Sequence, residues 1–413
     1  MPLLVLHYHE MWLKGGNRAF FLKKFEESIR LHLGGLGEVR LKHEDARMLV
    51  ELETAGALEE AARRLPRVFG LAYYSVAEEA ARDLDQVARL AWQQMAPQSF
   101  RTFAVRARRA DKTLPFQSAE AERHIGASLL QAARAAGREI SVNLTRPDLT
   151  CYVEFTSSRA LVYSAKLPGP GGMAANTAGK VVTLLSGGYD SAVAAYLMMK
   201  RGARVIFVHF HGVAAQPGES SEPIAREIAQ TLAVYQGAAR LYLVPFGELQ
   251  REIVLGAPES SRILLYRRLM LRIAEKFAYK QHALGLVTGD SLGQVASQTL
   301  QNLRAVGAAA RLPLYRPLVG MDKQEILDLA RRIGTYETSS ERFTDCCPAY
   351  LPRHPVLFAT PEEMEQAEQK LDIPSMVRRG VAGAVAEAYR VVEGRLVRWK
   401  AEESVEADAA QLA

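Results

Sequence analysis

The sequence predicts an α/β protein in its C-terminal half, built on a parallel sheet and preceded by an α+β region. Three observations predict this fold class. The chain has 413 residues, more than one hydrophobic core normally organises, so we expect two or three domains. Residues 168–172 alternate proline and glycine, which neither helix nor strand tolerates, so a linker is expected at 168–175. The pattern of apolar residues changes across this segment.

After the linker, short continuous apolar runs alternate with longer segments of helical spacing. Such strands are typical of βαβ units, in which helices cover both faces of a parallel sheet. Asp322 is the expected N-cap of the last helix and Gly334 its stop. We expect strands at 181–185, 204–210, 241–245 and 284–288, and helices at 191–201, 223–236, 261–280 and 322–333.

The N-terminal region mixes short strands and helices in an α+β pattern. We expect strands at 3–8, 48–51, 102–106 and 150–155, and helices at 18–33, 56–65, 83–94 and 118–136. This pattern indicates two small domains before the linker. The predicted domains are therefore 1–57, 58–167 and 176–400, with a frayed tail at 401–413.

Composition narrows the class of protein. Hydrophobic residues make up 48% and charged residues 24%, which is typical of a soluble globular protein and excludes disordered or fibrous classes. The chain shows no signal peptide and no long apolar run, so we expect a cytoplasmic location and no membrane partner. Three cysteines argue for a reducing compartment, and a net charge of +6 permits an anionic partner such as nucleic acid.

A candidate phosphate-binding loop lies between the strand at 181–185 and the helix that follows. Two glycines allow close backbone approach, the helix N-terminus supplies N–H donors, and two serines add hydroxyls. The loop residues are Ser186, Gly187, Gly188, Asp190 and Ser191. Asp190 would repel phosphate unless Mg²⁺ lies between them, which makes it a candidate Mg²⁺ ligand. A simple glycine turn with Asp190 as helix cap is the structural alternative.

The hexapeptide at 186–191, SGGYDS, resembles the pyrophosphate loop (SGGxDS) of the N-type ATP pyrophosphatases. It lacks the lysine of a Walker A loop. The resemblance implies an adenine nucleotide alpha hydrolase-like fold. It also implies that ATP is cleaved between its α and β phosphates to adenylate a carbonyl oxygen, which a nucleophile then displaces from AMP.

A second stretch, VTGDSLGQVASQ at 287–298, resembles a signature of the tRNA 4-thiouridine synthetases, or tRNA sulfurtransferases. The segment from Glu10 to Arg18 looks like the start of that family's ferredoxin-like domain, and 103–112 with 123–126 looks like its THUMP RNA-binding domain. The resemblance covers almost the whole chain. It implies ATP-dependent conversion of uridine 8 in tRNA into 4-thiouridine through an adenylated uridine. Some bacterial members also supply sulfur for thiamine thiazole synthesis.

The resemblance assigns further residues to the ATP site. They are Leu184, Leu185, His209, Phe210, Arg267, Gly289 and Gln298. Lys323 matches a basic residue that the family needs for activity, which makes it a candidate catalytic residue beside Asp190. From its position alone, Lys323 is equally an exposed residue in the first turn of a helix.

Basic residues gather in the predicted THUMP domain. The candidate RNA-binding residues are Arg101, Arg106, Arg108, Arg109, Lys112 and Arg123. Such a cluster can follow a phosphate backbone, although a solvated basic face is the plainer interpretation. Phe100 and Phe103 are interleaved with them, but their alternation with Val105 indicates core positions.

Cys346 and Cys347 are the candidate residues for sulfur transfer. Attack on an activated C4 atom needs an ionised sulfur, and Arg353 and His354 would lower the pKa of a nearby thiol. An inert loop pair is the alternative. The resemblance leaves open which cysteine acts, and we favour Cys347. An iron–sulfur cluster would need Cys151 as its third ligand, but Cys151 lies in an alternating strand that indicates core.

We expect no rhodanese domain within these residues, although many bacterial members of the family carry one. Sulfur is therefore expected from a cysteine desulfurase, another persulfide carrier or free sulfide. A thiamine sulfur-carrier protein and a homodimer remain open as partners. Two other functions also remain open: an amidating ligase that uses ammonia, and a non-catalytic tRNA-binding protein.

Overall fold

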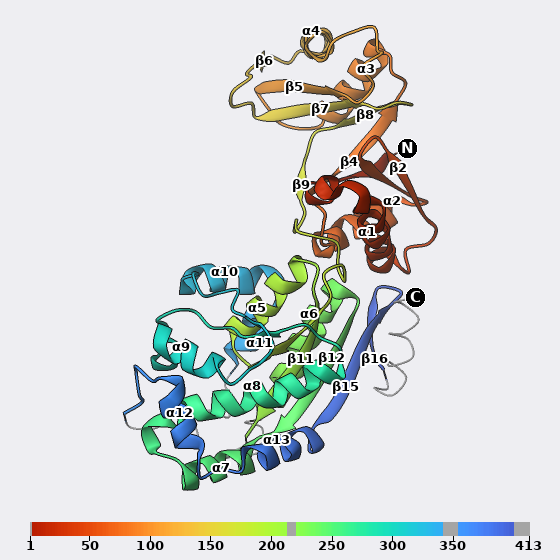
Figure 1. Ribbon diagram of the computed structural model, residues 1–413. Helices are drawn as coiled ribbons and strands as arrows, with labels where there is room; N and C mark the ends of the chain where they lie inside the picture. Colours follow the sequence, from red (N-terminus) through yellow and green to blue (C-terminus); the bar gives the residue numbers. More distant parts are fainter. Residues whose placement is uncertain (1, 213–219, 342–353, 400–413) are drawn as a thin grey trace. The chain divides into compact units, whose positions relative to one another are not determined.

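The computed structural model describes residues 2–212, 220–341 and 354–399. The chain divides into two compact units, residues 1–173 and 174–413, which are described separately (Figure 1). No helix in these described ranges is both long enough and apolar enough to cross a membrane.

A nine-stranded mixed sheet forms the framework of the first unit. Strand β5 pairs in parallel with β6 and β7, whereas the other pairs are antiparallel. The order is β2 (Val39–Glu44), β3 (Arg47–Leu52), β1 (Pro2–His7), β4 (Tyr73–Ala80), β8 (Ala160–Tyr163), β7 (Leu149–Phe155), β5 (Thr102–Arg109) and β6 (Ser141–Val142), with β9 (Leu167–Pro168) beside β4.

The helices of this unit form two groups along the sheet. The first group is η1 (Glu10–Asn17), α1 (Arg18–Leu33), α2 (Ala55–Arg64) and η2 (Leu65–Arg67), and the second is α3 (Leu84–Met95) and α4 (Ser118–Ala135). Helices α3 and α4 cover one face of β5 and β7, where Phe100 and Phe103 are buried as core residues, as predicted. Strand β4 pairs with β1 and with β8, so one sheet runs through both groups.

The proline- and glycine-rich segment is held against the first unit. Tyr73 and Tyr74 at the start of β4 pair with β9, and the Gly169 N–H donates to the Ala72 carbonyl. A Cβ atom on Gly169 would lie 2.2 Å from the Leu71 carbonyl oxygen, so only glycine allows this close approach. The segment that the sequence suggested as a linker therefore has a fixed path at this end.

The second unit is the predicted parallel α/β domain. Its first five strands are parallel, and the register pairs Leu184 with Val208 and Val182 with Leu286. The order is β14 (Leu314–Tyr315), β13 (Leu286–Val287), β10 (Lys180–Leu184), β11 (Arg204–His211), β12 (Ala238–Pro245), β15 (Val385–Val392) and β16 (Arg395–Trp399). The antiparallel strands β15 and β16, which extend the sheet beyond β12, were not predicted.

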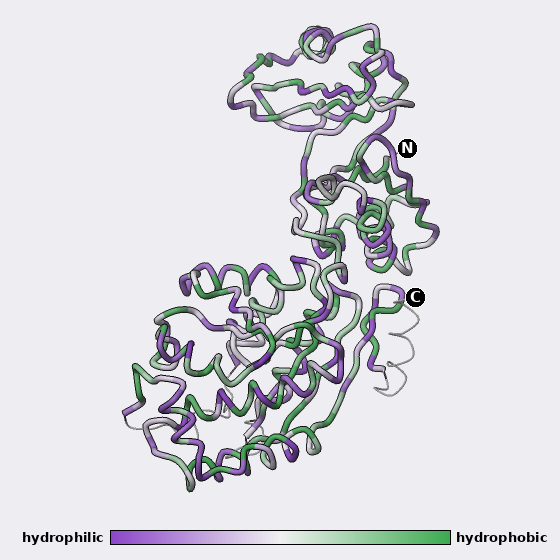
Figure 2. The backbone as a smooth tube through the Cα atoms, in the orientation of Figure 1, coloured by the Kyte–Doolittle hydropathy of each residue, from purple (hydrophilic) through white to green (hydrophobic). Residues whose placement is uncertain are grey.

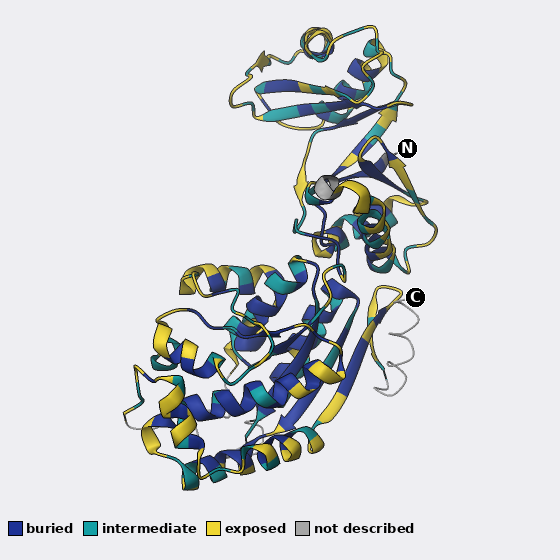
Figure 3. Ribbon diagram, in the orientation of Figure 1, coloured by how far each residue is buried: buried dark blue, intermediate teal, exposed yellow. Residues whose placement is uncertain are grey.

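Helices cover both faces of this sheet, as expected for a parallel sheet (Figures 1 and 3). One face carries α5 (Tyr189–Lys200), α6 (Glu222–Gln236), α10 (Lys323–Ile333) and α11 (Tyr336–Ser340). The other carries α7 (Gly247–Gly256), α8 (Arg262–Lys280), α9 (Leu300–Gly307), α12 (Pro361–Glu368) and α13 (Ile373–Ala382), with the short turns η3 (Glu259–Ser261) and η4 (Ala296–Gln298). Figure 2 shows that the central strands are largely hydrophobic.

The predicted strands and helices agree with the structure to within three residues at each end. Helix α10 shows why local signals sufficed. The Asp322 side chain accepts a hydrogen bond from the Glu325 N–H, and the Glu325 side chain accepts one from the Asp322 N–H. Gly334 ends the helix with a φ of 78°. Strand β4 and helices α7, α9, α12 and α13 were not predicted, although Thr299, Thr360 and Asp372 cap α9, α12 and α13 in the same way.

Candidate phosphate site and basic sheet face

The predicted phosphate loop leaves the carboxyl end of β10 and enters α5 directly. The Ser191 hydroxyl lies at its centre, 3.0 Å from the Ser186 N–H, which donates to it, and 3.0 Å from the Ser186 hydroxyl. The Gly188 N–H in turn donates to the Ser186 hydroxyl at 3.2 Å. Neither Gly187 nor Gly188 has a positive φ, so these glycines provide room rather than a left-handed turn. The N-terminus of α5 opens from this loop, which suits an anion.

Residues beneath the loop support it. His209 on β11 is fully buried and its Nδ1 lies 2.8 Å from the Leu185 carbonyl, while Nε2 lies 2.9 Å from the Ser221 hydroxyl. Phe210 is buried against Phe246. The structure therefore places His209 beside the loop, bonded to the Leu185 backbone where the loop begins, whereas Phe210 packs in the hydrophobic core with Phe246.

Gly289 allows β13 and the loop to approach each other. A Cβ atom at Gly289 would lie 2.6 Å from the backbone carbon of Asp190 and the nitrogen of Ser191. Backbone atoms cannot move aside without displacing the start of α5. The signature residue Gly289 thus lies in direct contact with the phosphate loop, although the two are about one hundred residues apart in sequence.

Asp190 and Lys323 form an ion pair at the edge of this site. The Lys323 Nζ lies 2.8 Å from the Asp190 Oδ1 atom, and the Gln294 side-chain amide donates to Oδ2 at 3.0 Å. Both charged side chains keep partial contact with solvent, with 45% of Lys323 and 24% of Asp190 exposed. The structure therefore brings both predicted catalytic residues of this region to one point. Gln294 was not singled out from the sequence.

An aromatic pair adjoins this ion pair. The Tyr189 and Tyr336 rings are stacked with centroids 5.3 Å apart, and the Tyr189 hydroxyl lies 3.0 Å from the Ser340 hydroxyl. The Lys323 Nζ lies 5.3 Å from the centroid of the Tyr189 ring. Tyr189 occupies the variable position of the SGGxDS motif, so no sequence signal drew attention to it.

A buried carboxylate organises a second polar cluster beside Gly289. Asp290 is 2% exposed and pairs with the guanidinium groups of Arg267 and Arg316. Burial alone would raise the pKa of Asp290, but the two arginines and the Thr288 hydroxyl lower it overall. Arg267 also donates to Ser297, and the Gln298 amide lies 3.5 Å from Asp290. Arg267 and Gln298 therefore lie together, held by Asp290, whose role the sequence did not indicate.

The donor set fits Mg²⁺ in one way. Asp190 presents one partly exposed carboxylate at a helix N-terminus, and Mg²⁺ is usually held by one or two carboxylates together with substrate phosphates. The Asp290 carboxylate pairs with two arginines, so it does not serve as a second carboxylate ligand for Mg²⁺. In the described ranges, no group of three or more potential metal ligands gathers. The site therefore suits a cation that phosphate oxygens help to bind.

The candidate sulfur-transfer residues Cys346 and Cys347 lie outside the described residues, as do Arg353 and the predicted tail at 401–413. Cys151 lies in β7 with 1% of its surface exposed, which confirms its interpretation as strand core. Burial raises the pKa of the Cys151 thiol to about 12, so this sulfur is protonated at neutral pH.

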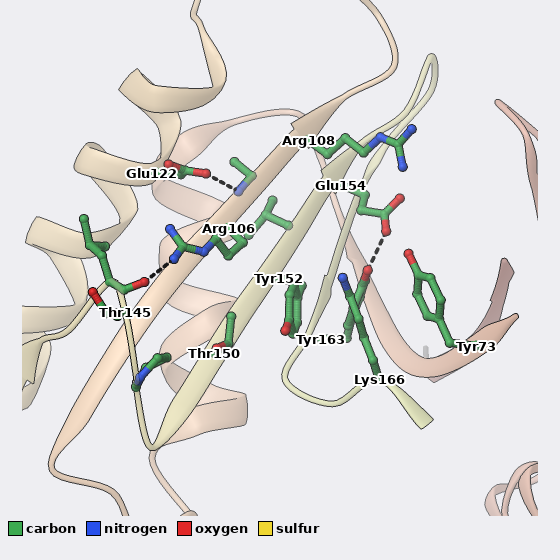
Figure 4. A pocket seen from close by; sticks show the side chains of 14 residues that line it. Tyr73, Arg106, Arg108, Glu122, Thr145, Thr150, Tyr152, Glu154, Tyr163 and Lys166 are labelled. Carbon is green, nitrogen blue, oxygen red and sulfur yellow. Dashed lines mark hydrogen bonds between the residues drawn. The ribbon is translucent and has the colours of Figure 1, made fainter. Parts of the chain in front are cut away.

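A basic groove crosses the sheet face of the first unit that α3 and α4 leave open (Figure 4). Its volume is about 400 Å³. Arg106 and Arg108 reach it from β5 because they alternate with the buried Val105. The Lys166 ammonium lies 4.0 Å from the Tyr152 ring and 5.0 Å from the Tyr73 ring. The alternation of side chains along β7 is enough to predict that Tyr152 lies on this face. Lys166 and Tyr73 come from other segments of the chain, so no local pattern predicts that they join Tyr152.

A buried ionic cluster forms the floor of this groove. Glu154 pairs with Arg47, lies 3.2 Å from the His7 ring nitrogen and accepts from the Tyr163 hydroxyl. Burial alone would raise the pKa of Glu154, but these partners lower it to about 2. Glu154 is therefore ionised at neutral pH and its charge is offset by Arg47.

The other predicted RNA-binding residues lie elsewhere in the first unit. Arg109 binds the Leu114 and Phe116 carbonyls and the Gln117 side chain, which closes the loop after β5. Arg123 is exposed on α4, the helix that covers the opposite face. Arg101 and Lys112 are exposed just before and just after β5. The structure therefore brings only Arg106 and Arg108 of the predicted set into the groove.

The second unit carries a pyrophosphate-type loop with an acid and a lysine at the carboxyl end of a parallel sheet, an arrangement that defines a nucleotide-binding enzyme fold. In this chain the fold is joined to ferredoxin-like and THUMP domains. Family models agree: the ThiI ferredoxin-like domain matches 3–75, the THUMP domain 81–165, and "Thiamine biosynthesis protein (ThiI)" 176–373. The chain is 44% identical over 369 residues to a probable tRNA sulfurtransferase of Thermus thermophilus, covering 89% of both chains. The chain belongs to the tRNA sulfurtransferase family.

Other relatives support this membership. A probable tRNA sulfurtransferase of Thermoanaerobacter sp. (strain X514) is 37% identical, with 90% of this chain and 95% of that protein covered. A crystal structure of a 4-thiouridine synthetase–RNA complex with bound ATP matches with a TM-score of 0.81 at 30% identity. That match covers 94% of this chain and 99% of the solved chain.

Proposed function

We propose that this protein transfers sulfur to uridine 8 of tRNA in an ATP-dependent reaction that gives 4-thiouridine. The observation that carries the proposal is the meeting of Asp190 and Lys323 at the phosphate loop, in a chain of this family. The related 4-thiouridine synthetase structure, a complex with RNA and ATP, supports ATP and tRNA as the substrates here.

The residues of the second unit suggest how the nucleotide is held. The N–H groups at the start of α5 and the Ser186 and Ser191 hydroxyls would bind phosphate oxygens. Asp190 would bind Mg²⁺, which when bound neutralises phosphate charge. Lys323 would then stabilise the negative charge that develops on the phosphates. The uridine O4 atom would attack the α phosphate, and pyrophosphate would leave.

The sulfur step completes the reaction. Sulfide would attack C4 of the adenylated uridine directly, and AMP would leave with the original oxygen. A cysteine persulfide would instead form a C4–S–S–cysteine disulfide as AMP leaves, and a second thiol would then attack the cysteine sulfur to release 4-thiouridine. The disulfide left between the two thiols would be reduced by an added thiol reductant. We propose that Cys346 or Cys347 delivers this sulfur, and that a cysteine desulfurase or another donor loads it. The name of the matching family model is the support for a second role in thiamine thiazole synthesis.

The basic groove of the first unit is the proposed tRNA contact. Arg106, Arg108 and Lys166 supply positive charge and Tyr152 supplies an aromatic face. Phosphate contacts by arginine and lysine position RNA, and aromatic rings stack on unpaired bases. Arg101, Lys112 and Arg123 would add charge outside the groove.

Thiolation of purified protein with unmodified tRNA tests the proposal. The protein is mixed with tRNA, Mg-ATP and sulfide, and the digested nucleosides are measured by mass spectrometry. ATP-dependent 4-thiouridine is the expected product, either directly or after a cysteine desulfurase and cysteine are added. Activity with ammonia instead would indicate an amidating ligase. Binding of tRNA without any product would indicate a non-catalytic RNA-binding protein.

A further inference from the structure

Among the residues that the structure describes, the Lys323 ammonium has two partners at the phosphate loop, and they differ in kind. One is the Asp190 carboxylate at 2.8 Å, and the other is the face of the Tyr189 ring, 5.3 Å from its centroid. A long lysine side chain loses considerable rotamer entropy when it is held in one place. With 45% of its side chain exposed, Lys323 needs such partners to stay at the loop.

The proposed function gives one of these partners a second task. If Asp190 binds the cation that accompanies ATP, its carboxylate is no longer fully available to Lys323. The ring face of Tyr189 attracts an ammonium group through its quadrupole, yet it has no lone-pair oxygen that competes for a divalent cation. The ring can therefore hold Lys323 when the carboxylate is occupied.

The Tyr189 ring is itself fixed in orientation. Tyr336 stacks on it at an interplanar angle of 27°, and the Ser340 hydroxyl lies 3.0 Å from the Tyr189 hydroxyl. Arg331 lies 4.4 Å from the Tyr336 ring and covers the outer end of the stack. Helices α10 and α11 thus hold the ring at the first residue of α5.

We propose that Tyr189 is a positioning residue, whose ring keeps the Lys323 ammonium at the phosphate loop when Asp190 binds the cation of Mg-ATP. This inference rests on the proposed function, because it takes Mg-ATP as the ligand of the loop. The ring face, rather than the hydroxyl group, carries the role. An aliphatic side chain at position 189 would fill similar space but would not hold the ammonium.

The test measures Mg-ATP affinity by calorimetry, a readout independent of sulfur transfer. Tyr189→Leu is expected to weaken Mg-ATP binding roughly three- to tenfold, as removal of one cation–π interaction predicts, with adenosine binding unchanged. Tyr189→Phe and the matched Ser340→Ala, which remove one hydroxyl each, are expected to bind within about twofold of the unmodified chain. Tyr189→Met replaces Tyr189→Leu if that variant does not fold.

A double-mutant cycle with Lys323→Gln separates positioning from a general effect on the fold. Without the ammonium, Tyr189→Leu is expected to cause no further loss of Mg-ATP affinity. An equal loss in both backgrounds, or an equal loss in Tyr189→Phe, would overturn the proposal. Unchanged Mg-ATP affinity in Tyr189→Leu would overturn the role of Tyr189 but not the proposed function. Absence of Mg-ATP binding by the unmodified chain would overturn both.

Discussion

Asp190 and Lys323 lie 133 positions apart in the chain, yet their charged groups meet at 2.8 Å beside the first turn of α5. The Asp190 carboxylate is suited to bind a cation and the Lys323 ammonium to bind phosphate, and each side chain holds the other in place. The pair stands at the carboxyl end of a parallel sheet, where α/β proteins bind ligands. The ion pair therefore connects the phosphate loop to the first residue of α10.

Gly289→Ala should reduce ATP binding sharply. The added methyl group would lie 2.6 Å from backbone atoms of Asp190 and Ser191, so the phosphate loop must shift. Misplacement of a loop by about 1 Å can reduce a rate about a hundredfold. We expect at least a tenfold loss of kcat/KM for ATP. Gly56→Ala is the matched control, since it lies in helix α2 with no atom within 4 Å; loss of activity there too would contradict the steric explanation.

Arg108→Gln should weaken tRNA binding without changing ATP affinity. Removing one arginine that binds a phosphate should reduce the slope of log K against log salt by roughly 0.7 to 0.9. Fluorescence titration of tRNA at several salt concentrations measures this slope. Arg134→Gln, on the last turn of α4, removes the same charge away from the groove. Equal effects of both substitutions would show that the groove has no special part in binding.

Glu154→Gln should destabilise the first unit at neutral pH. Removing one partner of a buried ion pair costs about 3 to 5 kcal/mol, because Arg47 would keep an uncompensated charge. The pKa of Glu154 is about 2 in the folded protein, below its ordinary 4.5. Its stabilisation is therefore present above pH 4.5 and is lost as the pH falls from there toward 2.

Thermal unfolding of Glu154→Gln between pH 7 and pH 3 measures this effect. The difference in melting temperature from the unmodified chain should shrink as the pH falls. Glu59→Gln, an exposed glutamate on α2, serves as the control and should leave the profile unchanged. A constant difference across the whole range would contradict the ionic role of Glu154.

Cys151→Ala should leave 4-thiouridine formation intact. The Cys151 thiol is buried and its pKa is raised to about 12, so it resists alkylation in the folded protein. Removing one buried sulfur should lower stability by about 1 kcal/mol. Iodoacetamide labelling followed by mass spectrometry measures its reactivity. Loss of activity in Cys151→Ala would favour an iron–sulfur cluster in which Cys151 is one of three cysteine ligands.

Local patterns were sufficient to predict much of the fold. Strand runs such as 204–210, the helix cap at Asp322 and the glycine stop at Gly334 are written in neighbouring residues. Strand β15 was missed because its partner β12 is more than one hundred residues away, and β16 was missed with it because β16 pairs with β15. Strand β4 was missed as well, and it is the strand that makes the sheet of the first unit continuous.

The site was predictable where a motif was local. The SGGYDS loop and Gly289 could be identified from sequence signatures, but the contact between them could not. Asp290 and Gln294 lie inside the signature at 287–298 and Tyr189 inside the loop motif, but their roles, like that of Lys166, depend on contacts across long separations. Cys346 and Cys347 lie outside the described residues and stay a prediction.

The origin of the oxygen in AMP tests the central claim most directly. Unmodified tRNA would carry ¹⁸O at C4 of uridine 8, and the reaction would be run with Mg-ATP and the sulfur donor. If the site adenylates uridine as proposed, each 4-thiouridine formed should be matched by one AMP that contains one ¹⁸O atom in its phosphate. AMP without the label, or ADP in place of AMP, would contradict an adenylated uridine.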